Sequence, residues 1–213
     1  MPVNFGLIGP GGIANRSLAP AINSVDGIQL WSVTSRSLDR AEKFARDHGA
    51  VRENPGFDDY DEMLADPQLD AVVISTPDRL HFEHGVKAAR AGKHVMMEKP
   101  MVASPSEARE LVSTCNSNGV KLGVAYHLRW HRGHRKLIKR IHDRELGEIH
   151  HARVQWSFQA EDDSNWRAHE KVGRWWGLGG VGTHGLDLIR WAMLPSCGEV
   201  KDINSTIANN YWG

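Results

Sequence analysis

Cysteine is scarce in this chain. Among its 213 residues only Cys115 and Cys197 carry a thiol, and they are far apart and form no Cys-x-x-Cys motif. A disulfide framework or a zinc ribbon needs several cysteines at short, regular spacings, so neither is indicated. Such low cysteine use is typical of proteins in a reducing compartment, and we expect a cytoplasmic location.

Net charge is also lacking. The 26 basic residues balance the 26 acidic residues, leaving neither an overall basic footprint nor an acidic block. Proteins that bind nucleic acid usually carry a basic patch, whereas solvating tails are strongly acidic. The composition therefore argues against nucleic-acid partners and favours a small-molecule partner.

Long apolar runs are absent as well. A membrane-spanning helix needs about 20 consecutive apolar residues, and no stretch reaches that length. The first apolar run begins at Val3, which leaves no room for the charged segment that opens a signal peptide. We therefore expect no membrane association. The content of hydrophobic residues, 40%, is nevertheless enough for a substantial core.

What the sequence does contain is a regular alternation of short apolar runs with longer amphipathic segments. The expected strands are Val3–Ile8, Ile28–Thr34, Ala71–Ser75, His94–Met97 and Lys121–Ala125. The expected helices, in which apolar residues recur three and four positions apart, are Ile13–Ile22, Asp39–His48, Arg79–Ala91 and Ser104–Asn116. This alternation predicts a doubly wound α/β domain, a parallel sheet with helices on both faces, over residues 1–125.

The pattern changes after Ala125. The expected elements there are a basic helix at 133–144, a strand at 148–158, a helix at 183–193 and a strand at 200–208. Residues 126–213 are thus predicted to form a partial α+β domain that binds substrate. Two strands and a helix cannot bury both faces of a sheet or protect its edges. We expect this domain to be incomplete, or to be completed by another chain, which favours a homo-oligomer formed through its sheet.

The segment GPGGIA at residues 9–14 joins the first expected strand to the first expected helix. It matches the pattern G-x-G-x-x-G/A of dinucleotide-binding loops. The first glycine permits a tight turn, the second lets a pyrophosphate approach the backbone, and the helix start presents N–H groups to the phosphates. A simple glycine turn is the alternative, but the context favours a Rossmann domain. The cofactor-binding residues predicted here are Gly9, Gly11, Gly12, Ile13 and Ala14.

The end of the second expected strand predicts which dinucleotide is bound. Chains that bind NAD tend to carry an acidic residue about 20 positions after the glycine loop, whereas this chain has the sequence TSRSLDR at 34–40. Hydroxyl and guanidinium groups suit the 2′-phosphate of NADP. NADP is therefore favoured, with NAD as the second option. The residues predicted to bind the phosphate are Ser35, Arg36, Ser37 and Arg40, although the two arginines are also compatible with a solvated helix start.

Three segments carry a resemblance to a known family: the glycine loop, ISTPDRLH at 74–81 and ARAGKHVMMEKP at 89–100. They are continued in order by YHLR at 126–129, ELGEI at 145–149 and GGVGTHGLD at 179–187. Together they resemble the glucose-fructose oxidoreductase/inositol dehydrogenase/MocA (Gfo/Idh/MocA) family of nicotinamide-dependent oxidoreductases. The resemblance implies a sugar, polyol or related cyclic substrate, and a chain that is shorter at its C-terminal end than its relatives.

The resemblance also implies roles for individual residues. In this family the lysine of Glu-Lys-Pro and the histidine before the second-domain helix flank the nicotinamide and the reacting carbon. Those positions are Lys99 and His184 here, and they are the expected catalytic residues. Thr76 and Pro77 are expected to line the nicotinamide, while Pro100 shapes the turn after the lysine.

Lysine suits the reaction because hydride transfer from a carbinol carbon requires removal of the hydroxyl proton, and the reverse reaction requires its return. Lys99 is expected at the carboxyl end of a parallel strand, where such sheets bind ligands. Partial desolvation and a positively charged nicotinamide would favour its neutral amine there. Adjacent strand residues face opposite sides of a sheet. Glu98 is therefore expected to anchor the strand end in the cofactor site. His81 is expected to help hold the helix start or the rim of the active site.

His184 is expected at a helix start that Thr183 caps, with Asp187 on the same face of the helix to orient the imidazole. A positive helix end would favour the neutral ring that a general base needs. Many catalytic relatives carry an aspartate where this chain has Gly180. Either the proton relay is organised differently here, or Lys99 acts with His184 alone. A histidine at a helix start is also compatible with a capping role only.

Three further histidines, His127, His131 and His134, have the spacing of one helical face and suggest a metal site. Gly133 interrupts the helical pattern and no cysteine or carboxylate accompanies them, so no metal site is predicted. The residues expected to contact substrate are His127, Arg129, Trp166 and Asp187. Trp166 belongs to a group with Trp175 and Trp176 that is equally compatible with stacking on a sugar ring and with a core.

These features together predict an NADP-preferring oxidoreductase that acts on a secondary alcohol or ketone. The alternative is a regulator or scaffold of the same fold that binds the nucleotide without turnover. The catalytic lysine and histidine argue against this alternative, whereas the missing aspartate leaves it open.

Overall fold

The structure is a computed structural model, and it describes residues 1–157 and 177–206. The chain divides into two compact units, Met1–Ala125 and Tyr126–Gly213. No helix in the described ranges is both long and apolar enough to cross a membrane.

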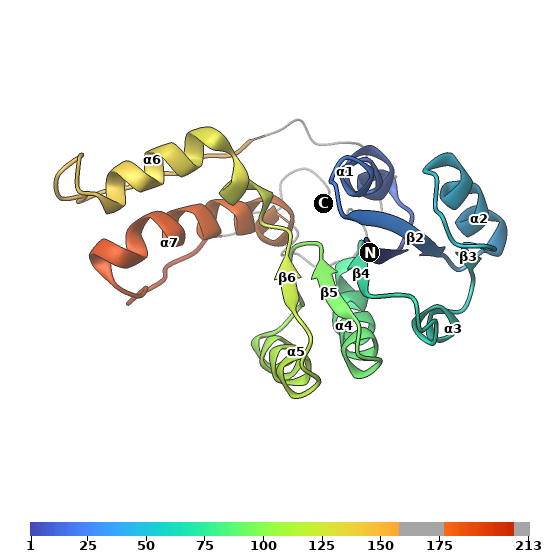
Figure 1. The fold of residues 1–213 in the computed structure, drawn as a ribbon. Coiled ribbons are helices and arrows are strands. Elements are labelled where there is room, and N and C mark those ends of the chain that lie inside the picture. Colours follow the sequence, from blue (N-terminus) through green and yellow to red (C-terminus); the bar gives the residue numbers. More distant parts are fainter. Residues whose placement is uncertain (158–176, 207–213) are drawn as a thin grey trace. The chain divides into compact units, whose positions relative to one another are not determined.

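The first unit is built on a six-stranded parallel sheet in the order β3-β2-β1-β4-β5-β6 (Figure 1). The strands are β1 (Val3–Ile8), β2 (Ile28–Thr34), β3 (Gly56–Phe57), β4 (Ala71–Ile74), β5 (His94–Met97) and β6 (Leu122–Val124). The chain runs outward from β1 to β3 and then returns to β4 on the other side of β1. This reversal between β1 and β4 is the switch point at which doubly wound sheets bind ligands. The predicted fold class is confirmed.

Helices cover both faces of the sheet (Figure 1). They are α1 (Ala19–Asn23), α2 (Leu38–Asp47), α3 (Tyr60–Leu64), α4 (His81–Arg90) and α5 (Pro105–Ser117). One core cluster joins Leu7 and Leu30 of the sheet to Phe44 of α2, and the other joins Val72 and Ile74 to residues of α3, α4 and α5. All four residues of β4 are buried, as expected for a central strand covered on both faces.

Side-chain caps fix the starts of three of these helices. The Ser37 hydroxyl accepts a hydrogen bond from a backbone N–H of α2, and the Asp59 carboxylate does the same for α3. Ser104 and Glu107 form a reciprocal capping box at α5. Ser104, the first residue of the helix expected at 104–116, is therefore its N-cap.

The structure also differs from the predicted elements. The expected helix at 13–22 consists of a π-helical stretch, η1 (Ala14–Leu18), followed by α1. A 3-10 turn, η2 (Asp78–Leu80), precedes α4. β3 and α3 were not predicted, because elements of two and five residues are too short to show a hydrophobic period.

The second unit is helical in the part that the structure describes. Its elements are η3 (His127–Trp130), α6 (Arg132–His142), the π-helical η6 (Leu178–Gly182) and α7 (Thr183–Cys197). The two predicted helices are present, but residues 148–157 and 200–206 form no strand, so the strand predictions are wrong there. A strand exists only where its backbone pairs with a neighbour, and an apolar alternation does not supply that neighbour. Oligomerisation through this sheet stays a prediction.

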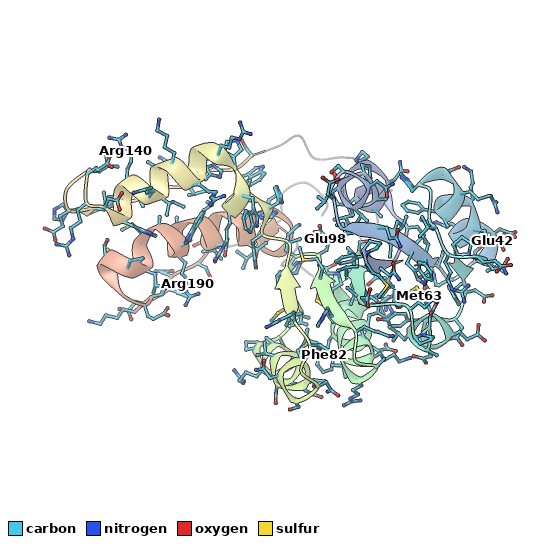
Figure 2. All side chains as sticks on the ribbon, viewed as in Figure 1. Glu42, Met63, Phe82, Glu98, Arg140 and Arg190 are labelled. Atoms are coloured by element: carbon cyan, nitrogen blue, oxygen red, sulfur yellow. The ribbon has the colours of Figure 1, made fainter. Side chains whose placement is uncertain are left out.

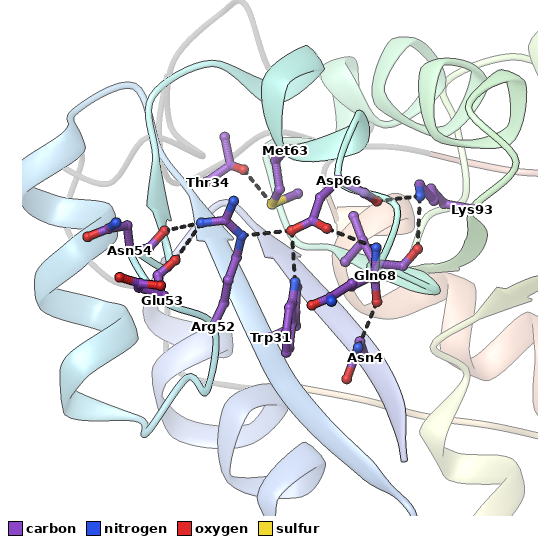
Figure 3. A network of polar contacts seen from close by, with 11 residues as sticks. Asn4, Trp31, Thr34, Arg52, Glu53, Asn54, Met63, Asp66, Gln68 and Lys93 are labelled. Carbon is purple, nitrogen blue, oxygen red and sulfur yellow. Dashed lines mark hydrogen bonds and ion pairs between the residues drawn. The ribbon is translucent and has the colours of Figure 1, made fainter. Parts of the chain in front are cut away.

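A polar network lies near the amino ends of β1, β4 and β5 (Figure 3). The Asp66 carboxylate accepts hydrogen bonds from Trp31 Nε1 at 3.0 Å and from Arg52 Nε at 2.7 Å, and its other oxygen accepts from the Gln68 N–H at 2.9 Å. Burial by itself raises the pKa of Asp66, but these hydrogen bonds outweigh it and lower the pKa below its usual value.

We expect Asp66→Asn to lower the free energy of unfolding by about 1.5–3 kcal/mol at neutral pH, since it weakens hydrogen bonds to a charged group. Because the folded-state pKa is depressed, this stabilisation is present above about pH 4 and is lost as the pH falls through the folded-state value. Urea unfolding at several pH values would measure both effects. Asp26→Asn, in an exposed turn, is the control; an equal effect of the two variants would contradict this account.

Candidate functional site

The predicted cofactor residues of the first unit follow β1, β2, β4 and β5 in the chain. Because these strands are parallel and adjacent, their carboxyl ends meet at one edge of the sheet. The tertiary structure therefore brings together four segments that lie far apart in the sequence, and this edge is the candidate site.

The glycine loop after β1 contains two glycines with different requirements. Gly9 has a φ of +83°, and a Cβ added there would lie 2.9 Å from the backbone nitrogen of Thr76. The protein itself therefore requires glycine at this position. A Cβ on Gly11 would meet only the Gly9 carbonyl oxygen, at 3.9 Å. Packing does not demand glycine at Gly11, but the close approach of an external phosphate does, so the loop fits a dinucleotide.

Beyond this loop, helical residues run without a break from 12 to 23. Gly12 and Ile13 are exposed at their start, and Ala14 is fully buried in the core cluster that contains Leu7. The first N–H groups of a helix have no partner within the helix and form an anion-binding end. The small side chain of Ala14 allows the helix to pack closely on the sheet at this point.

The segment after β4 is bonded to the glycine loop. The Ser75 hydroxyl donates to the carbonyl oxygens of Gly9 at 2.9 Å and of Ile8 at 3.2 Å. Thr76 Oγ1 lies 3.1 Å from Nδ1 of His84, whose pKa is lowered by burial. Ser75 and His84 were not predicted as site residues. The spacing of His81 and His84, one helical turn apart at the start of a helix, is the sequence signal that would have indicated His84.

At the end of β2, Ser35 continues the backbone pairing by donating its N–H to Phe57, and Ser37 caps α2. Arg36 and Ser37 are exposed. Arg40 extends from the first turn of α2 to the glycine loop, where its Nη2 donates to the Pro10 carbonyl oxygen at 2.8 Å. The structure therefore places one guanidinium group beside the loop.

The turn after β5 carries Glu98 and Lys99. The Glu98 N–H donates to Ile74 at 2.9 Å, which extends the pairing of β4 with β5, and its carboxylate accepts from the Lys99 N–H at 3.2 Å. Figure 2 labels Glu98 at this strand end. The peptide bond between Lys99 and Pro100 is cis. Glu98 thus closes the start of the turn that carries Lys99.

His81 lies inside the protein and is only 1% exposed. Its Nδ1 is 2.8 Å from the carbonyl oxygen of Pro100, and its Nε2 is 2.9 Å from that of Thr76. Each ring nitrogen therefore faces a backbone carbonyl oxygen at hydrogen-bonding distance, and the ring donates a hydrogen bond from whichever nitrogen carries a proton. His81 was predicted as a cofactor-binding residue that helps hold the helix start or the active-site rim; it is the first residue of α4 and lies buried beneath the candidate site.

In the second unit, His184 is 4% exposed and lies among aromatic rings. Its ring centroid is 4.8 Å from that of His127, 6.0 Å from that of Tyr126 and 5.7 Å from that of Trp156, which stacks on it. The Thr183 hydroxyl is hydrogen-bonded to Tyr126 at 2.8 Å and does not cap α7.

The expected position of His184 at a positive helix end is wrong. Helical residues run continuously from 177 through η6 into α7, so His184 lies within a helical segment. The end charge of a helix dipole acts only within its first turn. The argument that this charge favours a neutral imidazole therefore does not apply.

Arg129 and Asp187, predicted separately as substrate contacts, bind each other. Arg129 Nε and Nη2 donate to the two carboxylate oxygens of Asp187 at 2.8 and 2.6 Å, and this pairing raises the pKa of Arg129. The Trp191 ring lies 5.6 Å from the guanidinium carbon. A bidentate pair of this kind fixes both side chains. The carboxylate of Asp187 thus holds an arginine, in addition to any role toward His184.

The remaining predictions for the second unit concern metals and tryptophans. Within the described ranges, no three His, Cys, Asp or Glu side chains are grouped as a metal site would require. The rings of His131 and His134 contact each other at 4.7 Å, whereas His127 contacts His184. Trp166, with Trp175 and Trp176, lies outside the described residues.

Two family models match the chain. Residues 3–126 match the oxidoreductase family with an NAD-binding Rossmann fold (GFO_IDH_MocA), and residues 134–213 match the GFO/IDH/MocA C-terminal domain. Two similar curated proteins are the 1,5-anhydro-D-fructose reductase of Ensifer adhaerens, 36% identical over 70% of this chain, and the scyllo-inositol 2-dehydrogenase (NADP(+)) IolU of Bacillus subtilis, 36% identical over 66%. The chain spans 44% and 42% of their lengths.

Solved structures give the same result. A 3-ketoreductase from Actinomadura kijaniata in complex with NADP is 30% identical, with a TM-score of 0.64 over 70% of this chain and 46% of its own. An aldose-aldose oxidoreductase from Caulobacter crescentus has a TM-score of 0.76 over 90% of this chain and 58% of its own. Because the two sequences are only 24% identical, this similarity supports the fold alone.

Proposed function

Because the chain belongs to the Gfo/Idh/MocA family of oxidoreductases, we propose that the protein transfers a hydride between NADP and a secondary alcohol or ketone of a sugar, polyol or related cyclic compound. One observation carries the proposal. At the carboxyl edge of one sheet, a glycine loop that fits a dinucleotide lies beside Arg40 and Thr76, and the turn after the neighbouring strand β5 carries Lys99.

The pyrophosphate and the nicotinamide of the dinucleotide would be held by two segments of the first unit. Gly11 and the helix start at residues 12–14 would bind the pyrophosphate, and Thr76 with Pro77 would line the nicotinamide side. When bound, the nicotinamide supplies the hydride or accepts it. The Ser75 hydroxyl donates to the Gly9 carbonyl oxygen at 2.9 Å. This bond would hold the segment after β4 in a fixed position relative to the glycine loop.

The preference for NADP rests on the end of β2. No carboxylate is present at 34–37 to repel a 2′-phosphate. A guanidinium group has five N–H donors, so the bond from Arg40 to Pro10 leaves donors for a phosphate. Arg36 and the hydroxyl of Ser35 complete the proposed phosphate site, while Ser37 fixes the start of α2.

We expect Arg40→Ala to raise the dissociation constant for NADPH by about 10- to 100-fold, because a hydrogen bond to a charged group contributes about 1.5–3 kcal/mol. Affinity for NADH should change little, since NADH has no 2′-phosphate. Fluorescence titration with both cofactors measures the ratio. The matched control is Arg46→Ala, which replaces an exposed arginine at the other end of α2 that pairs with Glu42. If Arg40→Ala lowered the affinities for NADPH and NADH equally, the proposed preference for NADP would be contradicted.

Lys99 is the proposed acid/base residue, and His184 of the second unit is a second candidate. The amine of Lys99 would take the proton from the substrate hydroxyl as the hydride leaves, and return it in the reverse direction. His127 and the Arg129–Asp187 pair are proposed to contact substrate. The sugar or polyol class is supported by the names of the relatives: an anhydrofructose reductase and an inositol dehydrogenase.

Turnover with the purified protein tests this function. NADP⁺ with a panel of inositols and sugars, and NADPH with keto sugars, should give a change in nicotinamide absorbance. Tight NADPH binding without turnover on the whole panel would favour the alternative, a nucleotide-binding regulator or scaffold. Without dinucleotide binding, both functions would fail. Cytoplasmic location and homo-oligomerisation stay predictions.

A further inference from the structure

His81 joins two segments that the sheet no longer connects. The last backbone hydrogen bond between β4 and β5 in the described residues runs from the Glu98 N–H to the Ile74 carbonyl oxygen. Beyond it the chain continues as two separate turns. The His81 ring lies between them, with Nε2 2.9 Å from the Thr76 carbonyl oxygen and Nδ1 2.8 Å from the Pro100 carbonyl oxygen.

The turn that contains Thr76 is held from several sides. The Thr76 hydroxyl is 3.1 Å from His84, and the neighbouring Ser75 hydroxyl bonds to the carbonyl oxygen of Gly9. This turn is therefore fixed relative to the glycine loop. The His81 ring connects the turn that contains Lys99 to the turn that contains Thr76, and thereby to the glycine loop.

The surroundings of His81 make this connection stiff. The residue begins α4, whose buried residues Val86, Ala88 and Ala89 belong to a core cluster, so its backbone cannot shift without disturbing the core. Its side chain is 1% exposed, which excludes competition from solvent for the two contacts. A buried ring whose two nitrogens each lie within 3 Å of a backbone carbonyl oxygen has little freedom to rotate.

We propose that His81 is a positioning residue that sets the place of Lys99 relative to the cofactor loop. This inference rests on the proposed function, in which Lys99 transfers the proton and the glycine loop holds the dinucleotide. A displacement of about 1 Å at a reacting group can cost about 100-fold in rate. His81 thus acts on turnover through Lys99, without contact with substrate.

A purely structural histidine is the competing explanation, and a matched control separates the two. Lys93 is also buried, at 8% exposure, and its Nζ bonds to two backbone carbonyl oxygens, those of Asp66 and Leu69, at 2.7 and 2.9 Å. It lies directly before β5, at the opposite edge of the sheet. Lys93→Met therefore removes a comparable pair of buried contacts far from the turn of Lys99.

We expect His81→Phe to lower kcat by about 10- to 100-fold, with a dissociation constant for NADPH that changes less than about threefold, within about 0.65 kcal/mol. The kinetic isotope effect with deuterated NADPH should rise, because proton and hydride transfer become slower than product release. Lys93→Met should lose stability but keep kcat and the isotope effect. Should His81→Phe fail to fold, His81→Asn, which keeps one donor, takes its place.

A double-mutant cycle then decides whether His81 acts through Lys99. In the Lys99→Ala background, His81→Phe should cause no further loss of kcat, because the group that it positions is gone. Additive losses would overturn the proposal. A wild-type protein without turnover would refute the proposed function instead.

Amide hydrogen exchange tests the connection independently of catalysis. Exchange at Lys99 and at residues 101–103 should be faster in His81→Phe than in the wild type, while exchange in the glycine loop stays unchanged. Unchanged exchange after Lys99 would overturn the proposed positioning role, whatever the protein catalyses.

Discussion

Replacement of Lys99 by alanine should lower kcat by about 10²- to 10⁴-fold, the range typical for loss of a general acid or base. The loss is expected in kcat more than in cofactor affinity, because the glycine loop and Arg40 hold the dinucleotide and remain intact. Steady-state turnover, together with fluorescence titration of NADPH, would measure the two quantities separately. The variant should bind NADPH within about threefold of the wild type, a difference of about 0.65 kcal/mol.

Two further lysine variants sharpen this test. Lys99→Arg keeps the positive charge but cannot release a proton near neutral pH, so it should be as inactive as alanine if proton transfer is the role. Lys121→Ala removes an exposed lysine at the amino end of β6 and should retain full activity. Substantial turnover in Lys99→Ala would remove this residue from the proposed mechanism.

Replacement of Gly9 by alanine should abolish dinucleotide binding and lower the free energy of unfolding by about 2–5 kcal/mol. The left-handed conformation costs an alanine about 1–2 kcal/mol, and a Cβ placed 2.9 Å from the Thr76 backbone nitrogen adds about 1–3 kcal/mol of overpacking. Relief of that contact would move the glycine loop away from the segment after β4, and the phosphate-binding backbone would be displaced.

Gly27→Ala separates the two contributions. Gly27 has almost the same φ, +84°, but a Cβ there would meet no atom within 4 Å. This variant should therefore lose only the conformational part, about 1–2 kcal/mol, and should bind NADPH normally. Urea unfolding and cofactor titration of both variants would provide the comparison. Equal destabilisation would show that the contact with Thr76 has no energetic consequence.

The elements of the first unit could be predicted because their signals are local. β1, β2 and β5 begin and end at the predicted residues, since apolar runs with turn residues on both sides specify buried parallel strands. The cap at Ser104 depends on residues only three positions apart. The turn conformation of Gly9 likewise follows from a short motif between a strand and a helix.

Other features could not be predicted because they depend on partners distant in the sequence. The strands expected at 148–158 and 200–208 needed neighbours, and over their described residues no pairing forms. Thr183, expected as a cap, lies within a helical segment that is continuous from residue 177, and its hydroxyl is hydrogen-bonded to Tyr126, 57 positions away. The site residue Ser75 became apparent only through the bond of its hydroxyl to the glycine loop.

The sequence by itself determined the doubly wound fold, the glycine loop and the family, because hydrophobic period and short motifs are properties of neighbouring residues. Only the tertiary structure decided how the ends of the strands are connected. In the folded protein Arg40 donates to Pro10, Arg129 pairs with Asp187, and the ring of His81 lies between two turns. Hydrogen bonds between distant residues depend on the packing of whole elements, and no local pattern specifies that packing.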